Sequence, residues 1–184
     1  MDDKEHQKIK KDLSKYLGPE MISNRPGGAS GQLSYIEGWT IINIANKIFG
    51  YNNWSSKIKK MKIDFCENEN YRFSAGVSCV MKVKLKCGAS REDIGYGLCE
   101  NGRSKGQALE KARKEAATDA LKRTLRQFGN AMGNCLYDKN YLKNVKSIKK
   151  EVSQEIDKKN LLRRSDTKKS TNLSSIDLNS KDFI

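Results

Sequence analysis

The sequence predicts an α+β fold: an antiparallel three-stranded β-meander packed by a long helix, with further helices on its N-terminal side. Two observations lead to this class. Apolar and polar residues alternate through three consecutive stretches between residues 61 and 98, which is the period of strands with one face in solvent. Residues 104–128 then place apolar and alanine side chains at helical spacing. Because short turns join the three stretches, we expect a β-β-β-α core whose dry face is covered by the helix.

Two helices are expected before the meander. Residues 4–17 place four apolar side chains on one side of a helix, and Gly18-Pro19 provides a stop. These four are Ile9, Leu13, Tyr16 and Leu17. A second helix is expected at about 35–49 and ends at Gly50, while the glycine-rich residues 23–34 are expected to form a loop. The inward residues of the second helix are Ile41, Ile42, Ala45, Ile48 and Phe49.

The three strands share a wet face that carries lysines. The first strand alternates Met61, Ile63 and Phe65 with polar residues, and the second alternates apolar residues from Phe73 to Leu85. In the third strand, the larger residues Ile94, Tyr96 and Leu98 alternate with small or charged ones.

The C-terminal part of the chain has a different character. We expect one domain over residues 1–142, a helical extension over 143–162 and a disordered tail over 163–184. Val145, Ile148, Val152 and Ile156 have the spacing of one more amphipathic helix. The tail is polar and contains few large apolar residues, which is typical of disorder.

The charge of the chain favours an anionic partner. Lysine and arginine number 36 against 22 acidic residues, for a formal net charge of +14. Nucleic acid and an anionic membrane surface are both compatible with this excess. There is no run of 18 apolar residues, and the N-terminus MDDKEHQKIKK is charged throughout. We therefore expect neither a membrane-spanning helix nor a secreted protein.

The sequence offers no catalytic or metal-binding constellation. The five cysteines are scattered without a C-x-x-C pair, and His6 is the only histidine, so we expect no metal and no cofactor. The stretch GYGLCENGRSKGQ fits neither glycine-rich nucleotide motif. Asp64, Glu92 and Asp93 do not converge as a nuclease site would require, since neighbouring strand residues point to opposite faces. We expect a protein that is not an enzyme.

The long helix has one cationic side. On a helical wheel, Lys111, Lys114, Lys122 and Arg126 form a stripe within about 60° of its centre, and alanines and leucines occupy the opposite half. Glu115 and Asp119 are expected to pair with Lys111 and Arg123 at four-residue spacing. The stripe is either a solvated charged face or a surface that holds phosphates. Tyr35 is the aromatic residue that we single out for stacking on an unpaired base.

Several blocks of the sequence resemble a known family. The blocks are LGPEMISNRPGG, YIEGWTIINIANKIFGYNNW, EDIGYG and LEKARKEAATDALKRTLRQFGNAMGNCLYDKNYL. In this order, from about Leu17 to Leu142, they resemble the N-terminal half of the eukaryotic Rad52 proteins. Those are single-strand annealing proteins of homologous recombination. The resemblance implies that residues 1–142 join into a closed homo-oligomeric ring. It also implies an outer groove that binds single-stranded DNA, with duplex DNA bound more weakly.

The resemblance also implies which residues contact DNA. The groove residues are Arg25, Tyr35, Lys111, Lys114, Lys122, Arg123 and Arg126. A second DNA-contacting surface, matched less closely, consists of Arg72, Arg103, Lys139 and Lys143. Arg123 lies toward the packed side of the wheel, so the wheel alone does not assign it to the groove.

The implied function is ATP-independent annealing of complementary strands in double-strand break repair, in the nucleus. Longer family members continue into regions that bind the recombinase and the single-strand binding protein. The resemblance therefore does not decide whether this chain binds these two partners. The alternatives are a generic basic module of the double-stranded-RNA-binding type and a nucleotide-dependent or nucleolytic enzyme.

Overall fold

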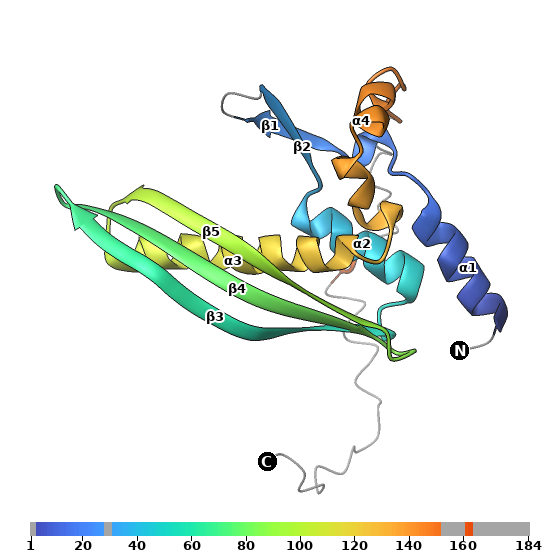
Figure 1. Ribbon diagram of the computed structural model, residues 1–184, viewed down its shortest axis with the longest axis horizontal. Coiled ribbons are helices and arrows are strands. Elements are labelled where there is room, and N and C mark those ends of the chain that lie inside the picture. Colours follow the sequence, from blue (N-terminus) through green and yellow to red (C-terminus); the bar gives the residue numbers. More distant parts are fainter. Residues whose placement is uncertain (1–2, 28–30, 152–160, 164–184) are drawn as a thin grey trace, which may run out of the picture. The chain divides into compact units, whose positions relative to one another are not determined.

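A three-stranded antiparallel sheet and one long helix form the centre of the fold (Figure 1). The computed structural model describes residues 3–27, 31–151 and 161–163. The sheet consists of β3 (Trp54–Glu69), β4 (Arg72–Leu85) and β5 (Ser90–Gly102), in the order β3-β4-β5. Helix α3 (Lys105–Arg126) follows directly and lies along one face of the sheet. The predicted β-β-β-α core is therefore confirmed, with a helix that is slightly shorter than the expected 104–128.

Alanines allow α3 to lie close against the sheet. Ala108, Ala112, Ala116 and Ala120 are all fully buried, and they pack with Ala75, Val77 and Cys79 of β4. The face of β5 under the helix carries glycines instead of large residues. A β-carbon built on Gly95 would lie 2.1 Å from the backbone nitrogen of Ala120. Only glycine fits at such a distance, so the helix sets the residue type on this strand.

The larger residues of β5 therefore lie on the face opposite the helix. Ile94, Tyr96 and Leu98 are 58%, 45% and 39% exposed.

On β3, in contrast, the large apolar residues lie on the same face of the sheet as the helix. The register places Ile58 opposite Met81, Met61 opposite Cys79 and Ile63 opposite Val77, which puts them on the face that α3 covers on β4. They are nevertheless exposed, because the helix lies mainly over β4 and β5. The described part of the chain thus leaves an apolar row on β3 open.

The N-terminal part contains a hairpin that the sequence did not predict. Helix α1 (Asp3–Ser14) and a 3₁₀ turn η1 (Pro19–Met21) precede β1 (Ser23–Pro26) and β2 (Gln32–Tyr35). The expected loop over residues 23–34 is therefore wrong for most of its length, since β1 and β2 pair antiparallel with Arg25 opposite Leu33. Gly27 and Gly31 follow β1 and precede β2, and the Gly27 N–H donates to the Gly31 carbonyl at 2.6 Å.

A second apolar cluster joins the helices to one end of the sheet. Helix α2 (Gly38–Phe49) buries Ile41, Ala45 and Phe49 in it, whereas Ile42, expected inside, is 37% exposed. Gly50 ends the helix with a φ of 84°, as predicted. Helix α1 ends at Ser14 rather than at residue 17, so Leu17 reaches the cluster from the segment that follows the helix.

The chain after α3 consists of short turns. These are the 3₁₀ segments η3 (Asn130–Met132) and η4 (Asn134–Tyr137), followed by α4 (Lys139–Val145). The Asp138 carboxylate caps α4 by accepting from the N–H groups of Asn140 and Tyr141. The helical extension predicted over 143–162 is not formed at residues 146–151: Val145 ends α4, Ile148 lies outside any helix, and Val152 and Ile156 lie outside the described residues. The same holds for residues 164–184 of the predicted tail.

Candidate nucleic-acid interface

The hairpin and the C-terminal half of α3 enclose a cationic cleft. Arg25 of β1 and Tyr35 of β2 line this cleft, of about 290 Å³, together with Lys122, Arg123 and Arg126 of α3. Five of the seven predicted groove residues thus share one cavity, although the hairpin and the helix are far apart in the sequence. The β1–β2 hairpin, which was expected to be a loop, supplies the second wall.

Tyr35 lies between the two walls of the cleft. The Arg25 guanidinium carbon and the Lys122 ammonium nitrogen each lie 5.6 Å from the centroid of its ring. The Tyr35 hydroxyl donates to the Glu37 carboxylate at 2.7 Å, and this bond raises the pKa of Tyr35. The ring is therefore held in place by its hydroxyl, and it attracts one cation from each wall.

A second cleft continues the first along α3. It has a volume of about 450 Å³, and Arg25 and Lys122 line both clefts. Lys114 lines the second cleft, where its ammonium group pairs with Glu110 at 2.6 Å. Both of these side chains are largely exposed, so the pair contributes little to stability and can exchange for another anion. Lys111 is exposed further along the same helix and lines neither cleft.

Asp93 of β5 holds both arginines of the cleft. Its carboxylate lies 3.3 Å from Nε of Arg123 and 3.5 Å from a terminal nitrogen of Arg126, and it accepts from the Gln127 amide at 3.0 Å. Partial burial alone would raise the pKa of Asp93, but these partners and the Ile94 N–H hold it below its usual value. Asp93 therefore carries a negative charge that offsets part of the positive potential of the cleft.

Arg126 is the most confined of these cations. Its guanidinium carbon lies 4.4 Å from the centroid of the Tyr137 ring. Its Nε is buried and has no hydrogen-bond partner among the described residues. Tyr137 and Asp93 together fix the direction of this side chain toward the cleft.

The two acidic residues beside the stripe have partners other than those predicted. Glu115 accepts from the N–H of Leu98 at 3.3 Å, and Asp119 accepts from the N–H of Tyr96 at 3.2 Å. Their expected pairing with Lys111 and Arg123 is therefore wrong. Strand β5 is at the edge of the sheet and has N–H groups without a neighbouring strand. These carboxylates satisfy two of them, which protects the edge from pairing with another strand.

The four residues of the second predicted surface form two separate pairs within this chain. Arg72 and Arg103 flank the register pair Phe73 and Gly102 at the start of α3. Lys139 and Lys143 lie on α4, which begins two residues after Tyr137, and Tyr137 contacts Arg126 at the other end of α3. A helix of 22 residues separates the two ends, a length of about 33 Å. All four side chains are exposed.

Comparison with known proteins gives the family. The profile described as "Rad52/22 family double-strand break repair protein" matches residues 5–155. The chain belongs to the Rad52/Rad22 family. It is 50% identical over 111 residues to the DNA repair and recombination protein RAD52 of Candida glabrata, which covers 60% of this chain and 22% of the relative. It is 49% identical over 108 residues to the protein of the same name in Saccharomyces cerevisiae, covering 59% of this chain and 23% of the relative.

The match concerns one part of the Rad52 relatives. The chain spans less than a quarter of their length: 22% of the Candida glabrata protein and 23% of the Saccharomyces cerevisiae protein. Within the described residues of this Rad52 family member, no helix is long and apolar enough to cross a membrane. The same residues contain no group of three or more histidine, cysteine or acidic side chains that could hold a metal ion.

Sequence reasoning missed three residues that contact the cations or the tyrosine of this Rad52 cleft. Asp93 was considered only as a member of a nuclease site, Glu37 was not singled out, and Tyr137 was not connected with Arg126. The signal that would have found Asp93 is its alternation with Gly95 and Gly97, whose lack of a side chain marks the face on which α3 packs. A lone carboxylate there needs a cationic partner from the helix.

Proposed function

We propose that this chain binds single-stranded DNA in the cleft between the β1–β2 hairpin and α3 and anneals it to a complementary strand. The biological setting is homologous recombination and double-strand break repair in the nucleus, in keeping with the family and with the names of its relatives. The observation that carries the proposal is the arrangement of Arg25 and Lys122 around the ring of Tyr35. These cations come from opposite walls, so a phosphate chain that passes along the cleft meets positive charge on both sides.

In this mechanism the protein binds the strand through its phosphates and leaves the bases free to pair. Release of counterions from the phosphates supplies sequence-independent binding energy. The cations also reduce the repulsion between two strands as a complementary strand approaches. Base pairing then provides the free energy of annealing, and no nucleotide hydrolysis or other catalytic step is required.

Tyr35 has a positioning role in this proposal. Its ring already contacts two cations, so a base could stack on it only if one of them moved. We therefore assign to Tyr35 the orientation of Arg25 and Lys122 first, and stacking second. Lys114 extends the path along the helix, because its exposed pair with Glu110 can be exchanged for a phosphate.

We further propose that the chain forms a closed homo-oligomeric ring. The exposed apolar row on β3, Ile58, Met61 and Ile63, supports a contact with a neighbouring copy. In such a ring, Arg72 and Arg103 of one copy could approach Lys139 and Lys143 of another and complete the second DNA-contacting surface. Duplex DNA is expected to bind less tightly than a single strand.

Annealing of two complementary oligonucleotides, measured together with the particle mass, tests the proposal. We expect acceleration without ATP or magnesium, by a particle many times heavier than one chain. Comparing a single strand with duplex DNA and duplex RNA of equal length separates this function from a double-stranded-RNA-binding module. Preferential binding of duplex RNA, or cleavage of labelled DNA in the presence of magnesium, would contradict it.

A further inference from the structure

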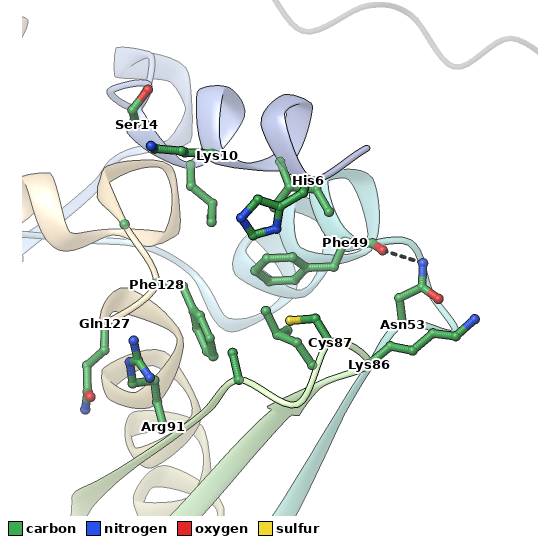
Figure 2. Close-up of a pocket in the computed structure, with 15 residues that line it drawn as sticks. His6, Lys10, Ser14, Phe49, Asn53, Lys86, Cys87, Arg91, Gln127 and Phe128 are labelled. Carbon is green, nitrogen blue, oxygen red and sulfur yellow. Dashed lines mark hydrogen bonds between the residues drawn. The ribbon is translucent and has the colours of Figure 1, made fainter. Parts of the chain in front are cut away.

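A cavity of about 380 Å³ lies away from the proposed groove, between α1, the end of α2, the β4–β5 turn and the segment after α3 (Figure 2). It shares no lining residue with either cleft of the candidate interface. Its apolar lining comes from all of these elements: Ile9, Leu13, Phe49, Leu85 and Phe128. The rings of Phe49 and Phe128 meet edge to face, with centroids 5.7 Å apart. An apolar group that entered this space would lose water on several sides at once.

The charged residues around the cavity all have one sign. Of the fifteen described residues that line it, Lys10, Lys86 and Arg91 are cationic and none is acidic. Figure 2 shows His6, Phe49 and Phe128 turned toward the cavity, with Lys10 on the α1 side and Arg91 on the strand side. The Arg91 guanidinium is held over the Phe128 ring at 5.5 Å. The cavity therefore suits an apolar group with a negative charge attached nearby.

The uncharged amide and hydroxyl donors of the lining already make hydrogen bonds within the protein. The Asn53 amide donates to the Phe49 carbonyl, the Gln127 amide donates to Glu92 and Asp93, and the Ser14 hydroxyl donates to Lys11. A nucleobase placed here would have to compete with these bonds for partners along its polar edge, and a buried polar group without a partner is unfavourable. A phenylalanine or leucine side chain carries no such penalty. These bonds favour a peptide over a nucleic acid.

We propose that this cavity is a docking site for a short acidic–apolar segment of a partner protein. One aromatic or branched aliphatic side chain fills the space between Leu13, Phe49 and Phe128, and neighbouring aspartate or glutamate carboxylates meet Lys10 and Arg91. The volume is at the low end of the range of about 300–1,000 Å³ for ligand pockets, which suits a few side chains of an extended segment. The cavity and the DNA cleft are separate, so both can be occupied at once.

A labelled synthetic peptide tests this proposal on the full chain. The probe is a fluorescein-labelled peptide of about ten residues with one phenylalanine and one leucine among aspartates, and binding is followed by fluorescence polarisation. Two control peptides replace either the aspartates with lysine or the two apolar residues with serine. We expect the probe to bind at least tenfold more tightly than either control. Equal binding of the serine control would overturn the proposal, since charge alone would then explain the interaction.

Substitutions locate the binding site. K10E/R91E is expected to weaken probe binding at least tenfold, and A89W, which fills the cavity from an exposed turn position, should do the same. The matched control K57E/K59E makes the same change of charge on β3 and is expected to leave probe binding within twofold. If the K57E/K59E control weakens binding as much as K10E/R91E, the peptide is attracted by net charge and the cavity assignment is wrong.

Cys87 provides an independent readout at the rim of the cavity. Its thiol is exposed, so the probe should slow its alkylation by at least threefold while the alkylation of Cys66 stays unchanged. Protection of Cys87 by an oligonucleotide and not by the probe would overturn the proposal in favour of nucleic acid. If Cys87 is already protected in the protein without the probe, and this protection is lost when the oligomer is dissociated, then a contact between copies covers the cavity and the proposal is overturned.

Discussion

The carboxylate of Asp93 lies 3.3 Å from Nε of Arg123, and this ion pair joins the edge strand of the sheet to the wall of the proposed DNA cleft. Asp93 also reaches Arg126 at 3.5 Å, so a single acid holds two of the proposed phosphate-binding cations. Before a phosphate can bind either guanidinium fully, it must compete with this carboxylate. Asp93 therefore orders the arginines and weakens their attraction for DNA at the same time.

Asp93→Asn is expected to raise the affinity for single-stranded DNA a few-fold at low salt. The asparagine keeps the shape and a hydrogen-bonding oxygen but removes the competing charge, and such partly exposed pairs are worth about 0.2–1 kcal/mol. A fluorescence titration with a labelled oligonucleotide measures the change. Lower affinity in a variant that is correctly folded would mean that the charge of Asp93 is needed to direct the two arginines.

The same residue gives a pH dependence of stability. The pKa of Asp93 is lowered in the folded state, so its stabilising contribution is complete above the usual aspartate pKa of about 3.9 and is lost as pH falls below that value. We expect the stability of the wild-type chain to fall more steeply than that of Asp93→Asn between about pH 4 and pH 2. Urea unfolding at several pH values measures the difference. Parallel curves would show that Asp93 gains nothing from its arginines.

Two substitutions of Tyr35 separate the ring from the hydroxyl. Tyr35→Phe keeps the surface that Arg25 and Lys122 contact and loses only the bond to Glu37, so single-strand affinity should stay within about threefold. Tyr35→Ala removes both cation–π contacts, each worth about 0.5–1 kcal/mol at an exposed site, and should weaken binding about tenfold. If Tyr35→Ala lowers only the melting temperature and leaves DNA affinity unchanged, the residue belongs to the core.

The contribution of Lys122 is measurable as a salt dependence. Each phosphate contact with a single strand contributes about −0.7 to the slope of log affinity against log salt concentration. Lys122→Ala should reduce the magnitude of that slope by about this amount and weaken binding equally for all sequences. Lys59→Ala on β3 is the matched control, because it removes one exposed lysine outside the cleft. Equal changes in the two variants would indicate that net charge, rather than the cleft, binds the strand.

The sequence predicts which helices and strands form better than it predicts which face of each strand packs against the helix. Strong alternation from Phe73 to Leu85 and the helical spacing of the alanines identify β4 and α3, because burial and periodicity act on the same residues. The face of β5 could not be predicted from apolar content, since close packing of α3 requires glycine at Gly95 and Gly97. The β1–β2 hairpin was missed because four-residue strands around a glycine-rich turn carry too few residues to show a period.

Part of the candidate site could be predicted from local sequence patterns, and part could not. The cationic stripe on α3 follows from helical geometry alone, and Tyr35 was singled out as an aromatic residue suited to stacking, whereas Arg25 was assigned only through family resemblance. The contact of Tyr35 with Lys122 joins segments far apart in the chain, and no local pattern reports such a contact. Arg123, which the wheel placed toward the packed side, is 38% exposed and is drawn to Asp93. Its position depends on a partner in the sheet, which a helical wheel does not contain.

The packing of α3 on β5 gives a last prediction with an internal control. A β-carbon on Gly97 would lie 2.0 Å from the Ala112 carbonyl oxygen, and one on Gly95 would lie 2.1 Å from the Ala120 nitrogen. Both obstacles are backbone atoms, so the helix itself must move. Gly95→Ala and Gly97→Ala should each lower the free energy of unfolding by about 1–3 kcal/mol or more, as measured by urea denaturation.

Gly106→Ala is the matched control. Gly106 lies in the first turn of α3, and a β-carbon there would meet nothing within 4 Å. The substitution should leave stability unchanged or raise it by up to about 1 kcal/mol, because alanine is the better helix former. The three variants make the same chemical change, so their difference isolates the contact between helix and sheet. If Gly95→Ala and Gly97→Ala were as stable as Gly106→Ala, α3 could not lie as close to β5 as the structure has it. The Asp93–Arg123 pair, which spans the same interface, would then lose its geometry as well.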